Sequence, residues 1–409
     1  MASRSFVIPR QIYYGTGALQ NLSTVTGQKA FIVTDPGVRA LGLVERTETI
    51  LQKINIKTAV FYKVEPDPSR DLVWSIFSQV QDFKPDIIVS IGGGSSIDAG
   101  KTAWLLYEHP DLAKLPFLDF LRQASTRELR KKAIFIAIAT TSGTGSEVTS
   151  AAVVTDRSVN PPYKAGFGSK HLVPDIAIAD PELAASMPPD VTANTGFDAF
   201  IHAIECYIFT QPSDMVDPIA IWSANTSFKW LPIAYADGKN MLAREKMHTA
   251  SLQAGIAFSN GRLGLVHGLA HEIGGTFHIP HGRANAFMLC HVFAFLYASK
   301  KDRMISLADH LGISGQDDSS KVNNLLTALD KLKDKVGIPL AIKNSGLDKN
   351  LFMGQLDAIS NDYMNQIARS PATGKMNVEE RRLAGIPYSA DQVKELFLNA
   401  WNGTSIKID

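Results

Sequence analysis

A chain of 409 residues is long enough for two or three domains with well-buried cores. Its composition, 45% apolar and 20% charged, is that of an ordinary globular protein. Lys and Arg total 41 against 40 for Asp and Glu, so the net charge does not indicate binding to nucleic acid or to an anionic membrane. Two cysteines argue against a disulfide framework, and neither the start MASRSFVIPR nor any apolar run suggests a signal peptide or membrane span. We therefore expect a cytoplasmic metabolic protein.

Up to about residue 185 the chain alternates short apolar runs with helical segments. The runs are KAFIVTD (29–35), DIIVSIG (86–92), AIFIAIA (133–139) and DIAIAD (175–180). Such nearly continuous apolar strings are typical of parallel strands that are covered on both faces. Strands that alternate with helices predict an α/β domain with a Rossmann-like parallel sheet over residues 1–185.

Beyond residue 186 the β-branched runs fade and helical patterns dominate, as in NTGFDAFIHAIECYIF and SKVNNLLTALDKLKDKVG. The change falls at SMPPDVTANTG (186–196), where Pro188, Pro189 and Asp190 can end one element and start another. We predict an all-α domain over residues 186–409.

The stretch IGGGSSIDAGK (91–101) follows a strand and opens a probable helix. Gly92, Gly93 and Gly94 allow positive φ angles and a close approach to a ligand, and a phosphate there would meet backbone amides at a helix N-terminus. Ser95 and Ser96 could cap the helix or donate hydroxyl hydrogen bonds. The stretch matches neither standard phosphate-loop fingerprint, and a tight structural turn is the alternative, but its setting favours a pyrophosphate site.

Two more polar positions follow strands. The loop ATTSGTGSEVTS (139–150) is rich in hydroxyls and glycines that suit a ribose, phosphate or carboxamide, although a Ser/Thr-rich turn would look alike. Asp35 ends the strand KAFIVTD, where a carboxylate can accept from ribose hydroxyls and repel a 2′-phosphate, or simply cap a turn. Ligands of open α/β sheets bind at these strand ends.

Asp198 and His202 stand four residues apart in GFDAFIHAIECY and so share one helix face. In isolation such a pair is more often a polar i,i+4 contact or a cap than half of a metal site. Seven of the ten histidines, however, fall between residues 198 and 291. His267 and His271 are again four apart, and Gly274, Gly275 and Pro280 then interrupt the helix, so His281 is expected to begin the next one. Asp198, His202, His267 and His281 together would suit a divalent transition metal.

Four long stretches carry a family resemblance: GGGSSIDAGK, TTSGTGSEVT, DPELAASMPPDVTANTGFDAFIHAIE and GLVHGLAHEIGGTFHIPHG. With them the chain resembles the iron-containing (group III) alcohol dehydrogenases, which share the architecture of dehydroquinate synthase. The resemblance covers essentially the whole chain. It implies an NAD(H) cofactor and makes Asp198, His202, His267 and His281 ligands of Fe(II), alternatively Zn(II) or Mn(II).

The resemblance also implies roles for other residues. Asp35 matches the residue that favours NAD over NADP, Lys164 reaches the ribose, and His271 is a non-ligand histidine considered as a proton relay. The remaining residues expected at the dinucleotide are Asp67, Gly93, Gly94, Ser95, Asp98, Thr140, Thr141, Thr144 and Leu183.

Three departures from the family pattern are visible. EPDPS with Asp67 replaces a frequent Pro-Asn-Pro, and Met187 replaces a leucine with little chemical consequence. Arg262 stands shortly before His267, where many relatives carry a small residue. A cation there could bind the anionic tail of a substrate, but an interdomain salt bridge or a nucleotide contact is at least as good an explanation.

These observations predict an alcohol dehydrogenase or aldehyde reductase that acts on a small primary alcohol or aldehyde, including one with an anionic tail such as sulfoacetaldehyde. His271 and Arg262 are its expected catalytic residues, and a homodimer or higher homo-oligomer is its expected state. The alternatives are a hydroxyacid–oxoacid transhydrogenase, a dehydroquinate-synthase-like lyase, whose phosphate-binding basic set is not evident, and a non-catalytic nucleotide-binding protein. Cys206 and Cys290 are expected to be buried structural residues.

Overall fold

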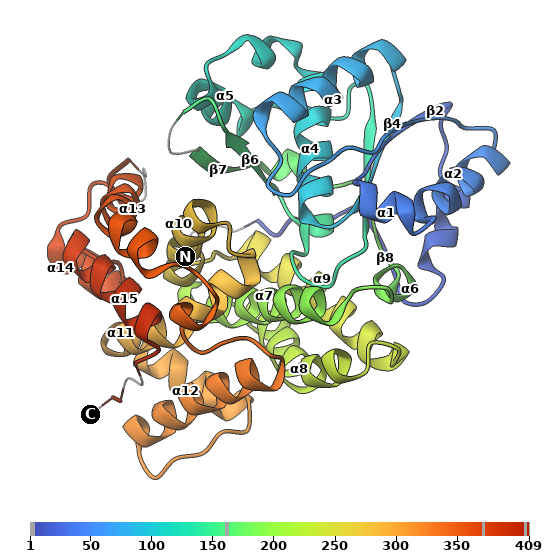
Figure 1. Ribbon diagram of the computed structural model, residues 1–409. Helices are drawn as coiled ribbons and strands as arrows, with labels where there is room; N and C mark the ends of the chain where they lie inside the picture. Colours follow the sequence, from blue (N-terminus) through green and yellow to red (C-terminus); the bar gives the residue numbers. More distant parts are fainter. Residues whose placement is uncertain (1–4, 160–162, 370–372, 405–406, 409) are drawn as a thin grey trace. The chain divides into compact units, whose positions relative to one another are not determined.

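The computed structural model describes residues 5–159, 163–369, 373–404 and 407–408 (Figure 1). The chain divides into two compact units, one of Met1–Pro188 with Gly238–Asn260 and one of Pro189–Asp237 with Gly261–Asp409. The main division lies close to the sequence boundary between residues 185 and 186. Helix α9 (Met241–Asn260) differs, because it belongs to the first unit although the sequence places it in the helical half.

The first unit is built on a six-stranded parallel sheet in the order β1-β8-β5-β4-β2-β3. Its strands are β1 (Gln11–Tyr14), β2 (Lys29–Val33), β3 (Lys57–Phe61), β4 (Ile87–Gly92), β5 (Ile134–Ala139) and β8 (Ile176–Ala179). The parallel sheet is confirmed, and its four central strands are the four predicted from apolar runs. The sequence missed β1 and β3 because these edge strands are only partly buried, so they lack a continuous apolar string.

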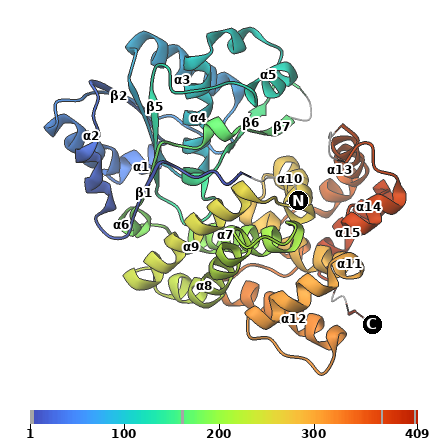
Figure 2. The same ribbon diagram turned by 180° about the vertical axis from the view of Figure 1, so that it is seen from behind.

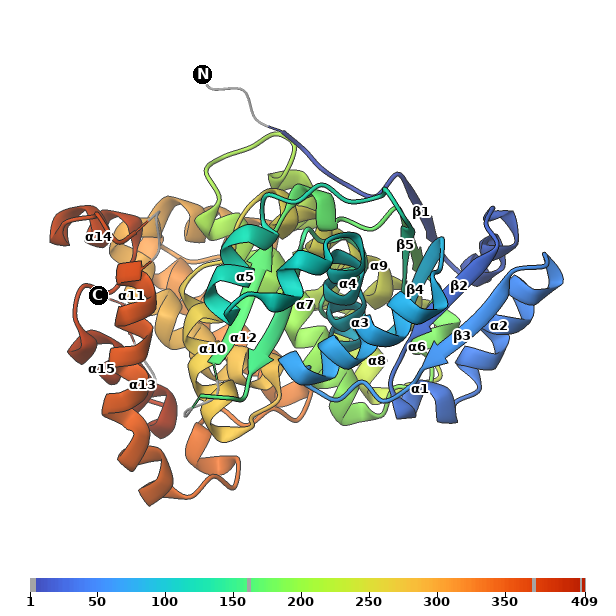
Figure 3. The ribbon, with the colours of Figure 1, turned by 90° about the horizontal axis from the view of Figure 1, so that it is seen from above.

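Alternate residues of the strands face two separate cores. Phe31 and Val33 of β2 pack with helices α3 (Arg70–Phe83) and α4 (Gly94–Glu108), whereas Ala30 and Ile32 pack with α2 (Leu43–Lys53). Figure 3 shows α3 and α4 on one side of the strands and α2 on the other. The helices of this unit, apart from α9, are α1 (Pro36–Ala40), α2 (Leu43–Lys53), α3 (Arg70–Phe83), α4 (Gly94–Glu108), α5 (Phe117–Ala124) and α6 (Pro181–Ala184). Short 3-10 turns are η1 (Ala18–Thr24), η2 (Pro110–Lys114), η3 (Ser146–Val148) and η4 (Lys170–Leu172).

A small antiparallel pair, β6 (Ala151–Asp156) and β7 (Tyr163–Gly168), was not predicted. Ala152, Val154, Ala165 and Phe167 from this pair join the core around α4. The pair extends the segment that leaves the loop 139–150, and so holds the end of that loop against α4.

Helix α9 joins the first unit through close packing on the same loop. Leu252 and Ile256 pack with Val148 of η3 and with β8. Gly145 and Gly255 approach so closely that a Cβ at Gly255 would lie 2.6 Å from the Gly145 carbonyl oxygen. These contacts join segments about a hundred residues apart, so the helical pattern of α9 alone could not assign it to the α/β unit.

The second unit is all-helical, as predicted (Figures 1 and 2). Its helices are α7 (Pro189–Phe209), α8 (Asp217–Ala236), α10 (Leu265–Phe277), α11 (His281–His310), α12 (Asp318–Lys335), α13 (Lys349–Arg369), α14 (Val378–Ala384) and α15 (Ala390–Asn402), with a 3-10 turn η5 (Ile342–Asn344). Helix α7 starts at Pro189, within the predicted break, and residues 196–209 are buried all round because α7 packs against both α8 and α11. Among the described residues, we find no helix with the length and apolarity needed to cross a membrane.

Candidate functional site

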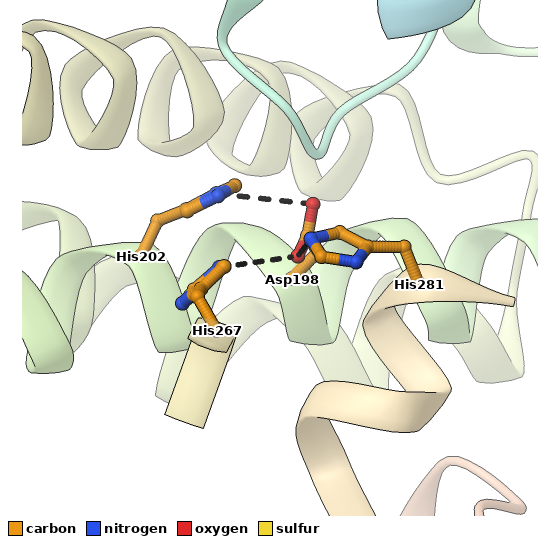
Figure 4. A group of neighbouring side chains, drawn as sticks. All are labelled: Asp198, His202, His267 and His281. Atoms are coloured by element: carbon orange, nitrogen blue, oxygen red, sulfur yellow. Dashed lines mark ion pairs between the residues drawn. The ribbon is translucent and has the colours of Figure 1, made fainter. Parts of the chain in front are cut away.

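Three helices of the second unit bring one carboxylate and three imidazoles together (Figure 4). Asp198 and His202 come from α7, His267 from the first turn of α10, and His281 is the first residue of α11. One ligand atom from each residue lies within 4.8 Å of those of the other three. The four residues singled out in the sequence therefore form one cluster.

The spacing within the cluster fits a shared cation. Nε2 of His267 and Nε2 of His281 each lie 3.7 Å from Oδ1 of Asp198, and Nδ1 of His202 lies 3.8 Å from Oδ2. These separations are too long for hydrogen bonds, but they are near the ~3.5 Å between ligands that are each ~2.1 Å from one tetrahedral ion. Nε2 of His267 is buried and has no hydrogen-bond partner among the described residues. A buried nitrogen lone pair aimed at a carboxylate and two imidazoles fits a metal ligand.

The electrostatics of the cluster are those of a cation site. Burial alone would raise the pKa of Asp198, but His202, His281 and His267 hold it well below its ordinary range. For His267, burial would lower the pKa, but Glu205 and Asp198 raise it to about 9. Positive charge is therefore strongly favoured at this point, and a divalent ion would supply it in place of protons.

Sequence reasoning missed two buried residues that contact the cluster. Glu205, fully buried on α7, accepts a hydrogen bond from Nδ1 of His267 at 2.5 Å. Asn285, one turn after His281, donates from Nδ2 to Oδ1 of Asp198 at 2.8 Å. Each lies three or four residues beyond a member of the cluster on the same helix, and this spacing, with a polar side chain in an apolar helix, is the signal that could have identified both.

His271 and Arg262 lie outside the four-residue cluster. The ring of His271 stacks on His281, with centroids 5.0 Å apart, so His271 is a close neighbour of the cluster. Arg262 is exposed, and its Nε donates to the carbonyl oxygen of Phe209 at the end of α7. The backbone N–H of Arg262 donates to the hydroxyl of Thr210. Cys206 and Cys290 are buried free thiols, as expected.

In the first unit, the glycine loop between β4 and α4 is shaped by contacts that leave no room for side chains. Gly92 has φ +154°, and a Cβ there would lie 2.5 Å from Oγ of Ser96 and 3.1 Å from Oδ2 of Asp35. Ser96 is buried and donates to Asp35 at 3.0 Å. Of the two roles expected for Ser95 and Ser96, Ser96 thus has the second, donation of a hydroxyl hydrogen bond. Neither serine caps α4, because the cap position is Gly93 and no side chain caps the helix, which leaves its N-terminal amides available.

The second loop packs directly on the first. A Cβ at Gly93 would lie 3.3 Å from Thr141, and one at Gly94 would lie 2.7 Å from Thr144. The backbone N–H of Thr140 donates to the carbonyl oxygen of Gly92. Asp35 belongs to the same group, because its Oδ2 contacts Ser96 while its Oδ1 caps α1. The structure thus brings together the three strand-end positions that the sequence selected.

Two charged residues of α4, Asp98 and Lys101, hold the loop 139–150 and the start of β6 in place. Asp98 accepts from the Ser146 hydroxyl at 2.6 Å and from the Val153 N–H at 3.0 Å, so its carboxylate is occupied by protein groups. Lys101 is fully buried and donates to the carbonyl oxygens of Thr149 and Ala151. Burial lowers the pKa of Lys101 to about 8 and raises that of Glu147 to about 7.

The remaining residues expected at the nucleotide lie in different surroundings. Lys164 on β7 forms an ion pair with Asp67, whose backbone is left-handed at φ 51°. Leu183 on α6 is 1% exposed and lies in the core beneath the sheet. Its side chain is therefore a packing residue.

Comparison with known proteins decides the family. Residues 9–181 match the family described as iron-containing alcohol dehydrogenase, and residues 192–380 match the C-terminal part of the Fe-containing alcohol dehydrogenase family. An NADPH-dependent butanol dehydrogenase of Clostridium saccharobutylicum is 36% identical over 402 residues, which cover 98% of this chain and 99% of that protein. The chain belongs to the iron-containing alcohol dehydrogenase family. The predicted family is confirmed, and the chain is an oxidoreductase that acts on CH–OH groups.

Solved structures of family members agree with this fold. A 1,3-propanediol oxidoreductase superposes with a TM-score of 0.83 at 28% identity, over 98% of this chain and 100% of that one. A sulfoacetaldehyde reductase of Bifidobacterium kashiwanohense, solved in complex with NAD+, superposes with a TM-score of 0.80 at 26% identity, over 98% and 99% of the two chains.

Proposed function

We propose that this iron-containing family member is an NAD(H)- and divalent-metal-dependent dehydrogenase that interconverts a small primary alcohol and its aldehyde. The observation that carries the proposal is the four-residue cluster on α7, α10 and α11, with its buried and unpartnered His267 nitrogen. Related proteins named for butanol and 1,3-propanediol support a small alcohol as substrate.

Asp198, His202, His267 and His281 would hold the ion, Fe(II) in the first instance and Zn(II) or Mn(II) as alternatives. When bound, a divalent ion supplies a Lewis acid that polarises a carbonyl group and favours hydride transfer to its carbon. Asp198 contributes the negative charge of the set, while Asn285 fixes the orientation of its carboxylate. We assign proton delivery to the alkoxide to His271, whose ring stacks on that of His281.

Asp35 favours NAD(H) over NADP(H) in this proposal. Its carboxylate lies against the glycine loop, 3.0 Å from the Ser96 hydroxyl. A 2′-phosphate placed beside it would meet a like charge, whereas ribose hydroxyls could donate to it. The related proteins do not decide the point, since one is named NADPH-dependent and another was solved with NAD+.

Turnover of purified, metal-loaded protein tests this function. With NADH and a panel that includes propanal and butanal, we expect oxidation of free cofactor and formation of the alcohol. A transhydrogenase would instead turn over only when a second carbonyl compound is present, because its nicotinamide would stay bound through both half-reactions. The absence of turnover with either arrangement, at full metal loading, would contradict the proposal.

A finer proposal gives Arg262 a role in recognising an anionic tail on the aldehyde. The likeness to a sulfoacetaldehyde reductase supports it. Arg262 also shares a surface pocket of about 600 Å³ with Lys300 and Arg303, but the described residues that line this pocket do not include any of the four cluster residues. The bond from Arg262 to Phe209 argues for a different role, because a cation at the last carbonyls of α7 stabilises the helix end.

Arg262→Ala separates the two roles. A charge-assisted contact to substrate is worth about 2–3 kcal/mol, so kcat/KM for sulfoacetaldehyde should fall by tens to about a hundredfold while that for propanal is kept. Equal losses with both aldehydes, or a wild-type preference for propanal, would assign Arg262 to the end of α7 alone.

A further inference from the structure

Glu205 is a fully buried carboxylate in the middle of the apolar part of α7. It stands three residues after His202 and seven after Asp198, so all three side chains share one face of the helix. A carboxylate without exposure is retained in a protein interior only where several donors satisfy it. Among the described residues, its donors all come from the start of α10.

Both oxygens of Glu205 bind the first turn of α10. Oε1 accepts from the backbone N–H of Val266 at 2.6 Å, and Oε2 accepts from that of His267 at 3.3 Å. The residue at the cap position of α10 is Gly264, which has no side chain with which to cap those amides. Glu205 therefore performs the capping from a neighbouring helix, where a negative charge also suits the helix dipole.

The same carboxylate holds the imidazole of His267. Oε2 accepts from Nδ1 at 2.5 Å, so Nδ1 carries the proton and the lone pair of Nε2 points to the other ligands. Glu205 thus holds His267 at two places, at its backbone N–H and at Nδ1 of its ring. Gly264 makes this approach possible, because a Cβ there would lie 2.3 Å from the ring of Phe209 on α7.

We propose that Glu205 is a positioning residue of the metal centre, which couples the cap of α10 to the tautomer and orientation of His267. The proposal rests on the metal centre of the proposed function and adds a residue outside its ligand set. Metal-ligating histidines commonly donate their second ring N–H to a carboxylate, and loss of that carboxylate typically weakens metal binding by about 10- to 100-fold. A purely structural cap would stabilise α10 without any effect on metal affinity.

The test compares Glu205→Gln with Glu272→Gln as a matched control. Glutamine has one acceptor oxygen, so it cannot serve both the α10 amides and Nδ1 of His267 as the carboxylate does. Glu272 is also a buried carboxylate on a helix of this unit, but its partner is Gln366 on α13. Each protein is loaded with Zn(II) and dialysed against a chelator series, and the retained metal is measured by elemental analysis. The melting temperature of each metal-free protein is measured in parallel.

We expect Glu205→Gln to lose half of its metal at a free Zn(II) concentration about 10- to 100-fold higher than wild type or Glu272→Gln. Wild-type metal affinity in Glu205→Gln, with only a lower melting temperature of the metal-free protein, would overturn the proposal and leave Glu205 as a cap.

If Glu205→Gln does not fold, Glu205→Asp gives the same decision, because its shorter side chain keeps the charge but not the reach to Nδ1. It should show a weakened metal affinity together with a shifted visible spectrum after Co(II) substitution. An unchanged affinity and spectrum would overturn the proposal. Failure of the wild-type protein to retain any metal would instead contradict the proposed function, and so the two failures are distinct.

Discussion

The α/β unit and the helical unit arrange polar groups in different ways. At the sheet, the groups expected to bind a dinucleotide are mainly backbone amides, hydroxyls and the carboxylate of Asp35, in short stretches that directly follow strands. In the helical unit, four ionisable side chains from three helices converge, and their partners Glu205 and Asn285 are completely buried. The first arrangement follows from local chain geometry, whereas the second depends on the packing of helices that lie far apart in the sequence. Substitutions should therefore act differently in the two units.

The largest effect is expected from removal of a ligand in the helical unit. His267→Ala or His281→Ala should reduce kcat by about a thousandfold or more, because the Lewis acid contributes several kcal/mol to the reaction. Elemental analysis should show a parallel loss of metal. His310→Ala is the matched control, since His310 is exposed at the far end of the same helix as His281. Full metal loading and turnover in both ligand variants would show that the cluster does not hold the catalytic ion.

In the α/β unit, the largest effect is expected from a substitution that adds a side chain to the glycine loop. Gly92→Ala would place a methyl group 2.5 Å from Oγ of Ser96 at a φ of +154°, which side chains rarely adopt. Strain of about 1–3 kcal/mol should raise the KM for NADH by about ten- to a hundredfold while metal content is kept. Gly275→Ala on α10 is the control, because the added Cβ would have no atom of the described residues within 4 Å other than the adjacent backbone of its own helix. An unchanged KM in Gly92→Ala would remove the glycine loop from the nucleotide site.

The choice of cofactor should depend on a single charge. Asp35→Ser keeps a side-chain oxygen to cap α1 but removes the carboxylate, so kcat/KM with NADPH relative to NADH should rise by about tenfold or more. Asp35→Gly should also narrow the preference for NADH over NADPH. It should in addition lower the melting temperature, because α1 loses its side-chain cap. If wild type already uses NADPH as well as NADH, our interpretation of Asp35 is wrong.

The smallest effect concerns stability and pH in the α/β unit. Burial raises the pKa of Glu147 from its ordinary 4.5 to about 7, so the folded state binds this proton more tightly than the unfolded chain. Stability should therefore fall as the pH rises from about 5 to 7, by about 1–3 kcal/mol for this group. Glu147→Gln has no proton to lose, and its melting temperature should change less over that range. Glu45→Gln, at an exposed site on α2, should keep the wild-type slope, and an equal slope in all three proteins would contradict the assignment.

Much of the fold and of the site could be predicted wherever the information is local. The central strands were evident from continuous apolar runs, and the start of α7 from its prolines. The four residues of the cluster were singled out from residue type and helical spacing within α7 and α10, and from the glycines and proline before His281. The edge strands β1 and β3 and strand β7 were missed, because partial burial leaves no continuous apolar string in them. Strand β6 is mostly buried, but its apolar run is only the short AAVV.

By itself, the sequence determined the four central strands, the polar loops that follow them and the helical half of the chain, and it showed which residue types could bind a phosphate or a metal. Only the tertiary structure decided that Glu205 binds His267 across 62 positions, that α9 belongs to the α/β unit, and that Arg262 contacts the end of α7. Periodicity and spacing report on neighbours within one or two helical turns. Contacts between distant segments depend on close approaches such as those at Gly264 and Gly255, where the absence of a side chain lets a ring or a second backbone come close. A glycine in the sequence does not reveal which partner will fill that space.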